Sequence, residues 1–405
     1  MIDSLGKKKL MILGGSRYAL PAIEAAHKLG CYVITCDYLP DNIAHKYSDY
    51  YCNVSIVDKE LVLRTAESLG IDGIMSFACD PGVVTAAYVA EKMGLPSVGS
   101  YEAVSILQNK GKFRSFLKEH GFNVPRAKCY KVLEDALQDV GQFRWPVIVK
   151  PTDSAGSKGV TRVDNLQELK KSIEHALKFS HSNEFIIEEY LQQKGYSSDT
   201  DCFSVDGQLK FVSFNCQRFD AGAENPYTPA AYSWPASISK KIQKELTDEI
   251  QRLITLLGLK SSIYNIETRA CIDGKAYIME CSPRAGGNRL AEVLRYATGV
   301  DLIINAVRAA IGEPVIDVQQ KPYNGEWAEI ILHSDKPGVF DGLWISEKVR
   351  DNVVEEDLWI SPGTMMGGFS AANEAIGTLI MNFETQERLE KVLMNQSRYI
   401  QVKIK

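Results

Sequence analysis

The sequence predicts a mixed α/β and α+β protein whose first domain is a doubly wound parallel sheet. Three observations lead to this prediction. Short apolar runs alternate with helical patterns from residue 9 to about residue 99, two Asp-Gly hairpin signals follow at residues 206–207 and 273–274, and the pattern changes again after Pro314. Alternating strands and helices are typical of a parallel sheet covered on both faces, whereas Asp-Gly turns join antiparallel strands.

The first hundred residues hold two features at the carboxyl ends of expected strands, where open parallel sheets bind ligands. These are the turn Gly14-Gly15-Ser16 and Asp37. Together they also fit the nucleotide site of an NAD-dependent oxidoreductase, but the GxGxxG spacing is absent, which favours a simple tight turn. The alternation predicts strands over residues 10–13, 32–36, 74–77 and 96–98 and helices over residues 21–29, 59–69 and 82–93.

A small-residue loop follows a buried strand in the central region. Residues 146–151 predict the strand, residues 153–159 form the loop, and residues 184–191 predict the next strand. Glycines let a backbone approach phosphate oxygens and present its amides to them, and Lys150 and Lys158 supply positive charge. The loop therefore indicates a phosphate site. An ordinary turn is the alternative, because the Walker A pattern GxxxxGK[ST] is absent.

Residues 219–235 fit no structural period and are interpreted as a long loop. Loops of this length in a compact domain are usually functional. Its aromatic residues Tyr227, Tyr232 and Trp234 either line a substrate pocket or anchor the loop, and the neighbouring Arg218 either binds an anion or is solvated.

Glu267 and Glu280 are the strongest candidates for a metal site. Residues 262–272 alternate like a strand, Asp273-Gly274 is a hairpin signal, and residues 275–282 lead back. Counting outward from the turn pairs Glu267 with Glu280 on one face of the hairpin. Like charges placed opposite each other destabilise a sheet, and a divalent hard cation reverses that effect. The alternatives are two solvated glutamates or a register slipped by one residue.

The composition predicts a globular protein of two or three domains. The chain has 405 residues, of which 45% are hydrophobic and 24% charged, and a net charge of −5. That charge argues against non-specific nucleic-acid binding, and no run of about 18 apolar residues suggests a membrane span. The apolar run at residues 10–13 is too short for a signal peptide, so a cytoplasmic location is expected. Nine scattered cysteines without a CxxC pair predict reduced thiols.

Six short motifs follow one another in order: NKGKF at 109–113, VIVKP at 147–151, SAGSKG at 154–159, IEEYL at 187–191, NIE at 265–267 and ECSPRAGGN at 280–288. This order resembles the ATP-grasp superfamily, and within it the carboxylate–amine ligases, a group with the biotin carboxylases, glycinamide ribonucleotide synthetases and L-amino acid ligases. The resemblance implies a Rossmann-like domain at residues 1–100, an ATP-grasp domain of two antiparallel α+β lobes at 101–315 with its small nucleotide-clamping lobe at about 122–190, and a small α+β C-terminal lobe at 316–405.

The resemblance also implies roles for individual residues. Glu267 and Glu280 would bind Mg²⁺, or Mn²⁺ in its place, with Ser282 as a third candidate ligand where many relatives have asparagine. Arg284 would bind a phosphate or the substrate carboxylate, and Lys158 in the glycine loop is the other candidate catalytic residue. The implied ATP contacts are Lys110, Lys150, Gly156, Ser157, Gly159, Glu188, the main chain of Glu189 and Leu191, and Asp199, with Asp201 as the other candidate for the ribose.

The implied function is that of an ATP- and Mg²⁺-dependent ligase that joins a small-molecule carboxylate to an amine through an acyl phosphate, releasing ADP and phosphate. The alternatives are a carboxylase-like enzyme that uses bicarbonate and a nucleotide-binding module without catalysis. Expected partners are small molecules rather than nucleic acid or membrane. The oligomeric state stays open, with a homodimer the commonest soluble assembly.

Overall fold

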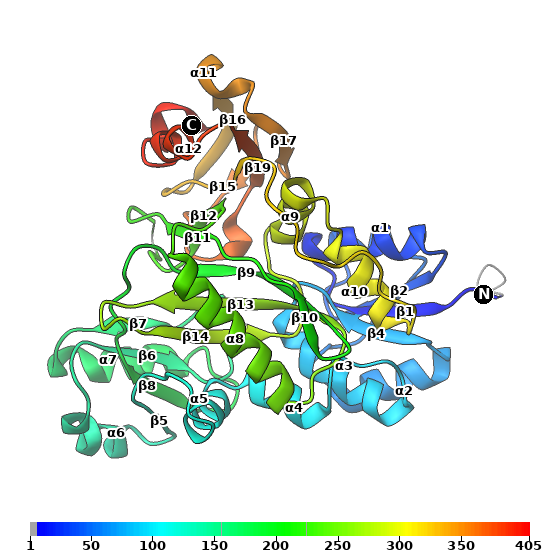
Figure 1. Ribbon diagram of the computed structural model, residues 1–405, viewed down its shortest axis with the longest axis horizontal. Coiled ribbons are helices and arrows are strands. Elements are labelled where there is room, and N and C mark those ends of the chain that lie inside the picture. The colour runs from blue at the N-terminus through cyan, green and yellow to red at the C-terminus, as the bar shows by residue number, and fades with distance from the viewer. Residues whose placement is uncertain (1–5, 155, 224) are drawn as a thin grey trace.

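The computed structural model describes residues 6–154, 156–223 and 225–405. Figure 1 shows the N-terminal domain in blue and cyan beside a central sheet in green, with a teal lobe at the lower left and the C-terminal lobe in orange and red at the top. Within the described residues one sheet is parallel and the others are antiparallel. The predicted fold class is therefore confirmed. No helix in these ranges has both the length and the apolar character needed to cross a membrane.

The N-terminal sheet has the order β3-β2-β1-β4, with all pairs parallel. Strands β1, β2 and β4 are buried on both faces because α1 packs on one side and α2 and α3 on the other, whereas the edge strand β3 is largely exposed. The predicted strand at residues 96–98 is wrong, since Pro96 has no amide to donate to a ladder. The elements are β1 (Lys9–Leu13), η2 (Arg17–Ala19), α1 (Leu20–Lys28), β2 (Tyr32–Asp37), η3 (Ile43–Lys46), β3 (Tyr50–Asn53), α2 (Lys59–Leu69), β4 (Gly73–Ser76) and α3 (Asp80–Met93).

The teal lobe is an antiparallel sheet of order β5-β8-β6-β7 with two helices on one face. Its core consists of alternate residues of the strands, such as Val147, Val149 and Phe185, packed on the apolar side of α7. The predicted strands at residues 146–151 and 184–191 are confirmed. The elements are β5 (Ala127–Tyr130), α6 (Leu133–Asp139), η4 (Val140–Gln142), β6 (Val147–Pro151), β7 (Thr161–Val163), α7 (Leu166–Leu177) and β8 (Phe185–Glu189).

The central sheet has the order β10-β9-β13-β14 and contains both predicted Asp-Gly hairpins. Helices α4, α5 and α8 cover one face, and α10 lies between the other face and the N-terminal sheet. The approach of α10 is close, since a Cβ at Gly73 would lie 2.3 Å from the Ala310 carbonyl oxygen. The elements are α4 (Tyr101–Gln108), α5 (Lys110–Glu119), β9 (Ser198–Val205), β10 (Gln208–Phe211), α8 (Lys240–Leu256), β13 (Ser262–Ala270), β14 (Ala276–Ser282), α9 (Leu290–Thr298) and α10 (Leu302–Ala310).

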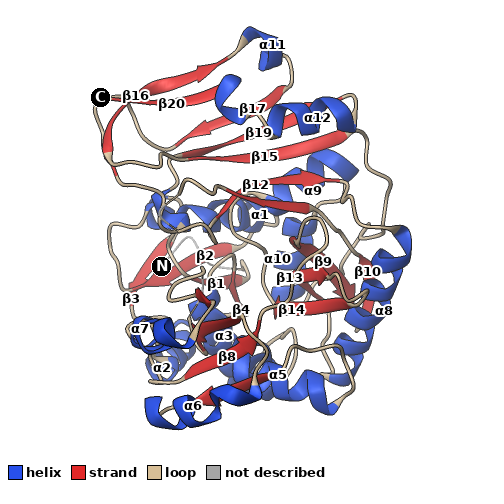
Figure 2. Cartoon of the chain, turned by 90° about the vertical axis from the view of Figure 1, so that its left-hand side faces the viewer, coloured by secondary structure: helices blue, strands red, loops and turns tan. Residues whose placement is uncertain are grey.

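The C-terminal lobe is built on a sheet of order β11-β12-β15-β19-β17, which Figure 2 shows above the other sheets. Strand β12 lies within the segment expected to be a long loop, and β11 ends at its first residue, so the prediction for residues 219–235 is wrong over residues 229–234. The described residues between Phe219 and Pro229 form no helix or strand. The elements are β11 (Cys216–Phe219), β12 (Pro229–Trp234), β15 (Glu326–Leu332), β16 (Gly338–Ile345), α11 (Glu347–Arg350), β17 (Val353–Leu358), β18 (Met365–Met366), η5 (Ala372–Glu374), β19 (Gly377–Phe383), α12 (Gln386–Leu393), η6 (Gln396–Arg398) and β20 (Ile400–Ile404).

Candidate active site

The β13–β14 hairpin places Glu267 opposite Glu280, as the sequence predicts. The turn is one residue longer than expected, because the Cys271 amide donates to the Lys275 carbonyl and Gly274 takes a φ of 80°. A register shift beside Glu267 leaves Met279 as an extra residue on β14 and restores the predicted pairing. The freed Met279 carbonyl accepts a hydrogen bond of 2.8 Å from Arg114 Nη1.

Acidic and polar side chains form two rows across the central sheet. In one row Glu267 on β13 lies between its partners Asp199 on β9 and Glu280 on β14. In the next row Asn265 lies between Asp201 and Ser282 in the same way. Paired residues of an antiparallel sheet share a face. The face that looks toward the teal lobe therefore carries a concentration of oxygen ligands, which is the donor set that Mg²⁺ prefers.

The two glutamates each have a cationic partner. Lys110 Nζ lies 3.4 Å from Glu280 Oε1, and Arg269 Nη2 lies 2.8 Å from Glu267 Oε1. Burial raises the pKa of Glu280, but the charges of Lys110, Lys150 and Arg114 outweigh that effect and hold the pKa below its usual value. Glu280 is thus held as a carboxylate, and its side chain is still half-exposed.

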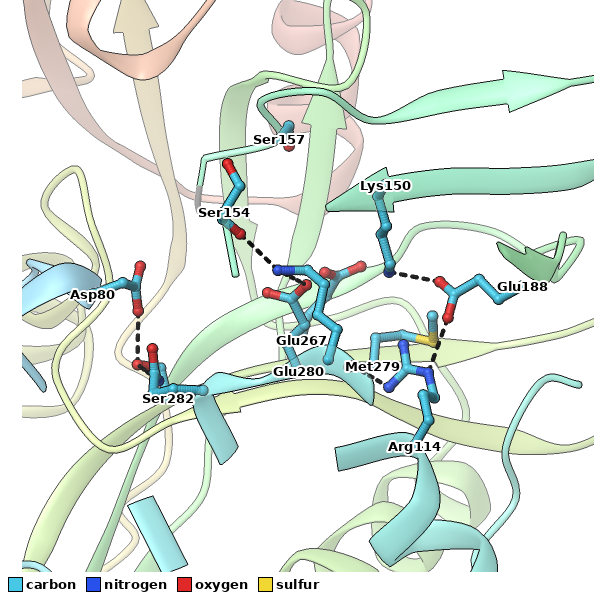
Figure 3. A network of polar contacts seen from close by, with 12 residues as sticks. Asp80, Arg114, Lys150, Ser154, Ser157, Glu188, Glu267, Met279, Glu280 and Ser282 are labelled. Atoms are coloured by element: carbon cyan, nitrogen blue, oxygen red, sulfur yellow. Dashed lines mark hydrogen bonds and ion pairs between the residues drawn. The ribbon is translucent and has the colours of Figure 1, made fainter. Parts of the chain in front are cut away.

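A buried ion cluster adjoins the glutamates, as Figure 3 shows. Glu188 Oε1 lies 2.5 Å from Lys150 Nζ, and Glu188 Oε2 accepts a 3.0 Å hydrogen bond from Arg114 Nε. All three side chains are less than 9% exposed. Burial opposes the charge of Glu188, yet Arg114 and Lys150 lower its pKa to about 2. Burial lowers the pKa of Lys150 despite Glu188, so this lysine is held in a desolvated position.

The glycine loop has left-handed backbone at Gly156, Ser157 and Gly159. The Ser154 carbonyl accepts a 2.7 Å hydrogen bond from Lys110 Nζ. On the far side of the loop, Ser157 Oγ donates to the Tyr227 carbonyl at 3.1 Å. The loop therefore bridges Lys110 and the segment between β11 and β12.

Lys158 is exposed and forms no ion pair with the residues that the structure describes. Gly156 is exposed as well, whereas Gly159 is buried against Pro151 and Phe179. The tip of the loop thus leaves one lysine free to contact a ligand.

The strand end at Glu189 and Leu191 lies beside an apolar cluster. Leu191 packs against Cys271, Tyr277 and Met279. The Glu189 carboxylate points away toward Arg144, which donates to it at 2.8, 2.9 and 3.0 Å, and the Glu189 amide donates to the Arg126 carbonyl. Leu191 is the partly buried member of this apolar cluster, and the other three side chains are buried.

Arg284 forms a two-pronged contact with Asp80. Its Nε donates to Asp80 Oδ1 at 2.8 Å and its Nη2 donates to Oδ2 at 2.6 Å. Burial would lower the pKa of Arg284, but Asp80 raises it above its usual value. Ser282 donates to Asp80 Oδ1 and accepts from Gln108 Nε2, each at 2.8 Å. The Ser282 hydroxyl is therefore engaged in the contact with Asp80, which Figure 3 also shows.

Two buried acids support the segment between β14 and α9. Asp201 accepts from the Gly286 amide at 2.7 Å, and Glu329 accepts from the Arg289 amide at 2.9 Å. The second oxygen of each has no partner among the described residues. Burial raises the pKa of Asp201 to about 7. Burial and repulsion from Glu292 raise the pKa of Glu329 to about 8. In the neighbouring row, burial and repulsion from Glu267 raise the pKa of Asp199 to about 7.

A polar cavity of about 350 Å³ lies between α1, α9 and β17. The N-terminal domain contributes Arg17 and Tyr18 to its lining, and the C-terminal lobe contributes Trp359. Arg289, just before α9, and Glu292, within α9, line the remaining side. Tyr18 donates to Asn288 Oδ1 at 3.4 Å, which places the cavity at the end of the ECSPRAGGN segment. The cavity therefore lies where the ECSPRAGGN segment meets α9.

Other sequence candidates have structural partners. Arg218 is not solvated: its side chain is 11% exposed, and Nη2 lies 2.5 Å from Glu390 Oε1. Tyr232 and Trp234 are buried in β12, and Trp234 Nε1 donates to Ser213 Oγ. Asp37 accepts from the Gly15 amide at 2.8 Å, so these two groups stabilise a tight turn rather than remain open for a dinucleotide.

The sequence reasoning missed Arg114, Gln108 and Glu329. Arg114 lies within the amphipathic pattern of a helix, and the sequence gives no sign that its side chain crosses to Glu188. Glu329 did carry a signal, because it is a lone acid in the apolar run Trp327-Ala-Glu-Ile-Ile-Leu332. Charged residues are rarely buried without a partner, so an acid in such a strand marks a site for inspection.

Comparison with known proteins agrees with this geometry. Residues 143–292 match the family model of the ATP-grasp domain. The large chain of carbamoyl phosphate synthase from Thermoanaerobacter sp. (strain X514) is 27% identical over 266 residues, which are 64% of this chain and 23% of that protein. The match thus spans less than a quarter of that relative's length.

Two solved structures share the whole fold. The L-amino acid ligase from Bacillus licheniformis has a TM-score of 0.82 at 19% identity, covering 98% of this chain and 99% of its own. Phosphoribosylglycinamide synthetase from Anaerococcus prevotii has a TM-score of 0.77 at 22% identity, covering 98% and 100%. The domain match over residues 143–292 and these shared folds confirm the resemblance to the ATP-grasp superfamily.

Proposed function

We propose that this protein is an ATP- and Mg²⁺-dependent ligase that joins a small-molecule carboxylate to an amine through an acyl phosphate. The observation that most directly supports the proposal is the position of Glu267 and Glu280, side by side on one face and flanked by the lysines Lys110 and Lys150. A metal–nucleotide complex needs carboxylate oxygens to bind the cation and, next to them, ammonium groups to bind the phosphates.

The donor set fits Mg²⁺. Glu267 and Glu280 would hold the ion through carboxylate oxygens, with phosphate oxygens and water completing its shell. When bound, Mg²⁺ neutralises charge that develops on the phosphate oxygens. Ser282 stays a candidate ligand, and its hydroxyl would have to leave Asp80 to take that role.

The chain offers contacts for each part of ATP. Lys110 and Lys150 would bind its phosphates, exchanging Glu280 and Glu188 for phosphate oxygens. Gly156, Ser157 and Gly159 would close over the phosphates with their amides, and the exposed Lys158 would reach the transferred group.

The base and ribose would lie at the other end of the site. Leu191 and Met279 supply an apolar surface for adenine beside the Glu189 main chain, with Glu188 close by. Asp199 would accept from the ribose hydroxyls at the end of the acidic row. Asp201 Oδ1 accepts from the Gly286 amide, and Asp199 Oδ2 accepts from Gln217 Nε2 and from the Tyr232 hydroxyl, each at 3.3 Å, so both acids stay candidates for this role.

The chemistry would rest on positioning and on charge. A carboxylate oxygen of the acid attacks the γ-phosphorus, the bond to the β,γ-bridging oxygen breaks, and ADP leaves. The amine nitrogen then attacks the acyl carbon, the carbon–oxygen bond to phosphate breaks, inorganic phosphate leaves, and the nitrogen loses a proton. Arg284 would bind the acid or the acyl phosphate through the two guanidinium hydrogens that its contacts with Asp80 and the Ala285 carbonyl leave available, and Asp80 orients it.

The 350 Å³ cavity beside Asn288 is the proposed acceptor pocket. It opens between three parts of the chain, so an amine bound there would be enclosed by the N-terminal domain, α9 and the C-terminal lobe. Enclosure matters because an acyl phosphate reacts with water. The hydrogen bond from Ser157 to the Tyr227 carbonyl makes the glycine loop and the β11–β12 segment candidate lids.

A coupled ADP-release screen over pairs of carboxylates and amines tests the proposal. We expect ADP release that requires Mg²⁺ and both substrates and that is lost in Glu280→Gln. The amide product should form in an amount equal to the ADP released. Bicarbonate is included as an acid, because release with bicarbonate would indicate the carboxylase-like alternative. ATP binding without release over the whole panel would contradict the ligase proposal and indicate a binding module, and tight NADH binding would point to an oxidoreductase instead.

A further inference from the structure

A second group of metal-type ligands lies outside the proposed ATP site, where β11 and β15 end. Asp220 follows β11, and His333 and Asp335 follow β15. Both strands are antiparallel to β12, which lies between them, so they run in the same direction and end at the same edge of the sheet. Carboxylate oxygens of the two aspartates and a ring nitrogen of His333 all lie within 4.8 Å of one another.

The His333 ring is fixed with one nitrogen facing the aspartates. Its Nδ1 lies 2.7 Å from the Ile331 carbonyl oxygen, which only accepts, so Nδ1 carries a proton. The ring stacks on Phe369 at 3.9 Å between centroids, and the side chain is 6% exposed. The other ring nitrogen, Nε2, faces Asp220 Oδ2 at 3.2 Å. A histidine held in this way through its other nitrogen is typical of metal ligation.

The spacing suits a tetrahedral ion. Ligand bonds of roughly 2.0–2.2 Å place neighbouring ligand atoms about 3.3–3.5 Å apart, and Asp220 Oδ2 and His333 Nε2 are 3.2 Å apart. Asp335 Oδ1 is 4.0 Å from Nε2, and its half-exposed side chain has room to move closer. A Cβ at Gly222 would come within 3.3 Å of both carboxylates, so glycine leaves the space between them open.

We propose that Asp220, His333 and Asp335 bind one first-row divalent cation of the Zn²⁺ class, with a fourth position for water. One imidazole with two carboxylates is a mixed nitrogen and oxygen set, which favours such a cation over Mg²⁺.

The site would tie the segment between β11 and β12 to the chain that follows β15. In that segment Thr228 Oγ1 donates to the Ser370 carbonyl, and the Tyr227 carbonyl accepts from Ser157 of the glycine loop. The cation would thus stiffen a surface against which the glycine loop rests. The site itself does not depend on the ligase proposal.

Cobalt titration of the full chain in a large excess of Mg²⁺ tests the site. Co²⁺ reports its ligands through visible absorption, and thiolate coordination by any of the nine free cysteines would add a charge-transfer band that a nitrogen and oxygen site lacks. We expect one tightly bound Co²⁺ without that band, displaced by Zn²⁺. His333→Gln and Asp335→Asn should each weaken binding by about a hundredfold or more.

His181→Gln is the matched control, because His181 is exposed on the teal lobe and should leave Co²⁺ binding unchanged. Metal-free unfolding of Asp335→Asn should match the wild type, which separates loss of a ligand from loss of the fold. Absence of tight Co²⁺ binding in the wild type, or equal binding in His333→Gln and Asp335→Asn, would overturn the proposal. ADP release measured in parallel keeps this result separate from a failure of the ligase proposal.

Discussion

Replacement of Lys150 by methionine removes one charge from the buried cluster while keeping most of the side-chain volume. Lys150 is 6% exposed and lies 2.5 Å from Glu188 Oε1. Breaking one side of a buried pair costs about 3–5 kcal/mol, and the lower end applies because Arg114 still contacts Glu188. We therefore expect the free energy of unfolding to fall by about 3 kcal/mol.

The same variant should bind ATP weakly. A charge-assisted contact to phosphate contributes about 1.5–3 kcal/mol, which corresponds to a rise of about 10- to 150-fold in the dissociation constant for ATP. Calorimetric titration with ATP and Mg²⁺ measures this effect, and urea unfolding at neutral pH measures stability. Lys171→Met, at an exposed position on α7 of the same lobe, is the control and should change neither quantity. An unaltered ATP response in folded Lys150→Met would remove Lys150 from the phosphate site.

Three further predictions concern the central sheet and its neighbours. Glu280→Gln should lower turnover by about a hundredfold or more while nucleotide binding without metal is retained; ADP release at wild-type level would refute the metal role. Arg284→Lys should raise the KM for the acid about tenfold, because lysine cannot match its two contacts to Asp80; an unchanged KM would argue against acid binding there. Glu329 has a folded-state pKa raised to about 8, so its contribution to stability is present below its unfolded pKa and is lost as pH rises toward 8. The free energy of unfolding of the wild type minus that of Glu329→Gln should fall by about 1.4 kcal/mol per pH unit between about pH 5 and pH 8. Unfolding free energies of the two proteins that change in parallel with pH would contradict this.

The sequence was most informative where local patterns decide structure. The alternation of short apolar runs with helical patterns predicted the parallel sheet. The Asp-Gly turn signal, together with the rule that every second residue of a strand shares a face, predicted the Glu267–Glu280 pair. The pairing was right although the turn is one residue longer, because the extra residue Met279 compensates. A bulge of this kind depends on the Arg114 side chain from a distant helix, and a local pattern does not contain that contact.

The parts that were missed depend on contacts between distant segments. The β12 strand was read as loop because Pro229 and mixed polarity hide its period, yet pairing with β15 makes Tyr232 and Trp234 core residues. The sequence around His333 contains no sign of its partner Asp220, which lies 3.2 Å from it but more than a hundred positions earlier in the chain. Such pairs follow from sheet topology, which is fixed only when the whole chain has folded.

A crystal structure with Mn²⁺ and a non-hydrolysable ATP analogue gives the most direct test of the proposed metal–nucleotide site, since Mn²⁺ is located by its anomalous scattering. We predict a peak between the carboxylates of Glu267 and Glu280, bridging them to the phosphate oxygens. The account would be contradicted if anomalous density appeared only at other places in the structure. It would also be contradicted if these two side chains pointed to opposite faces of the sheet.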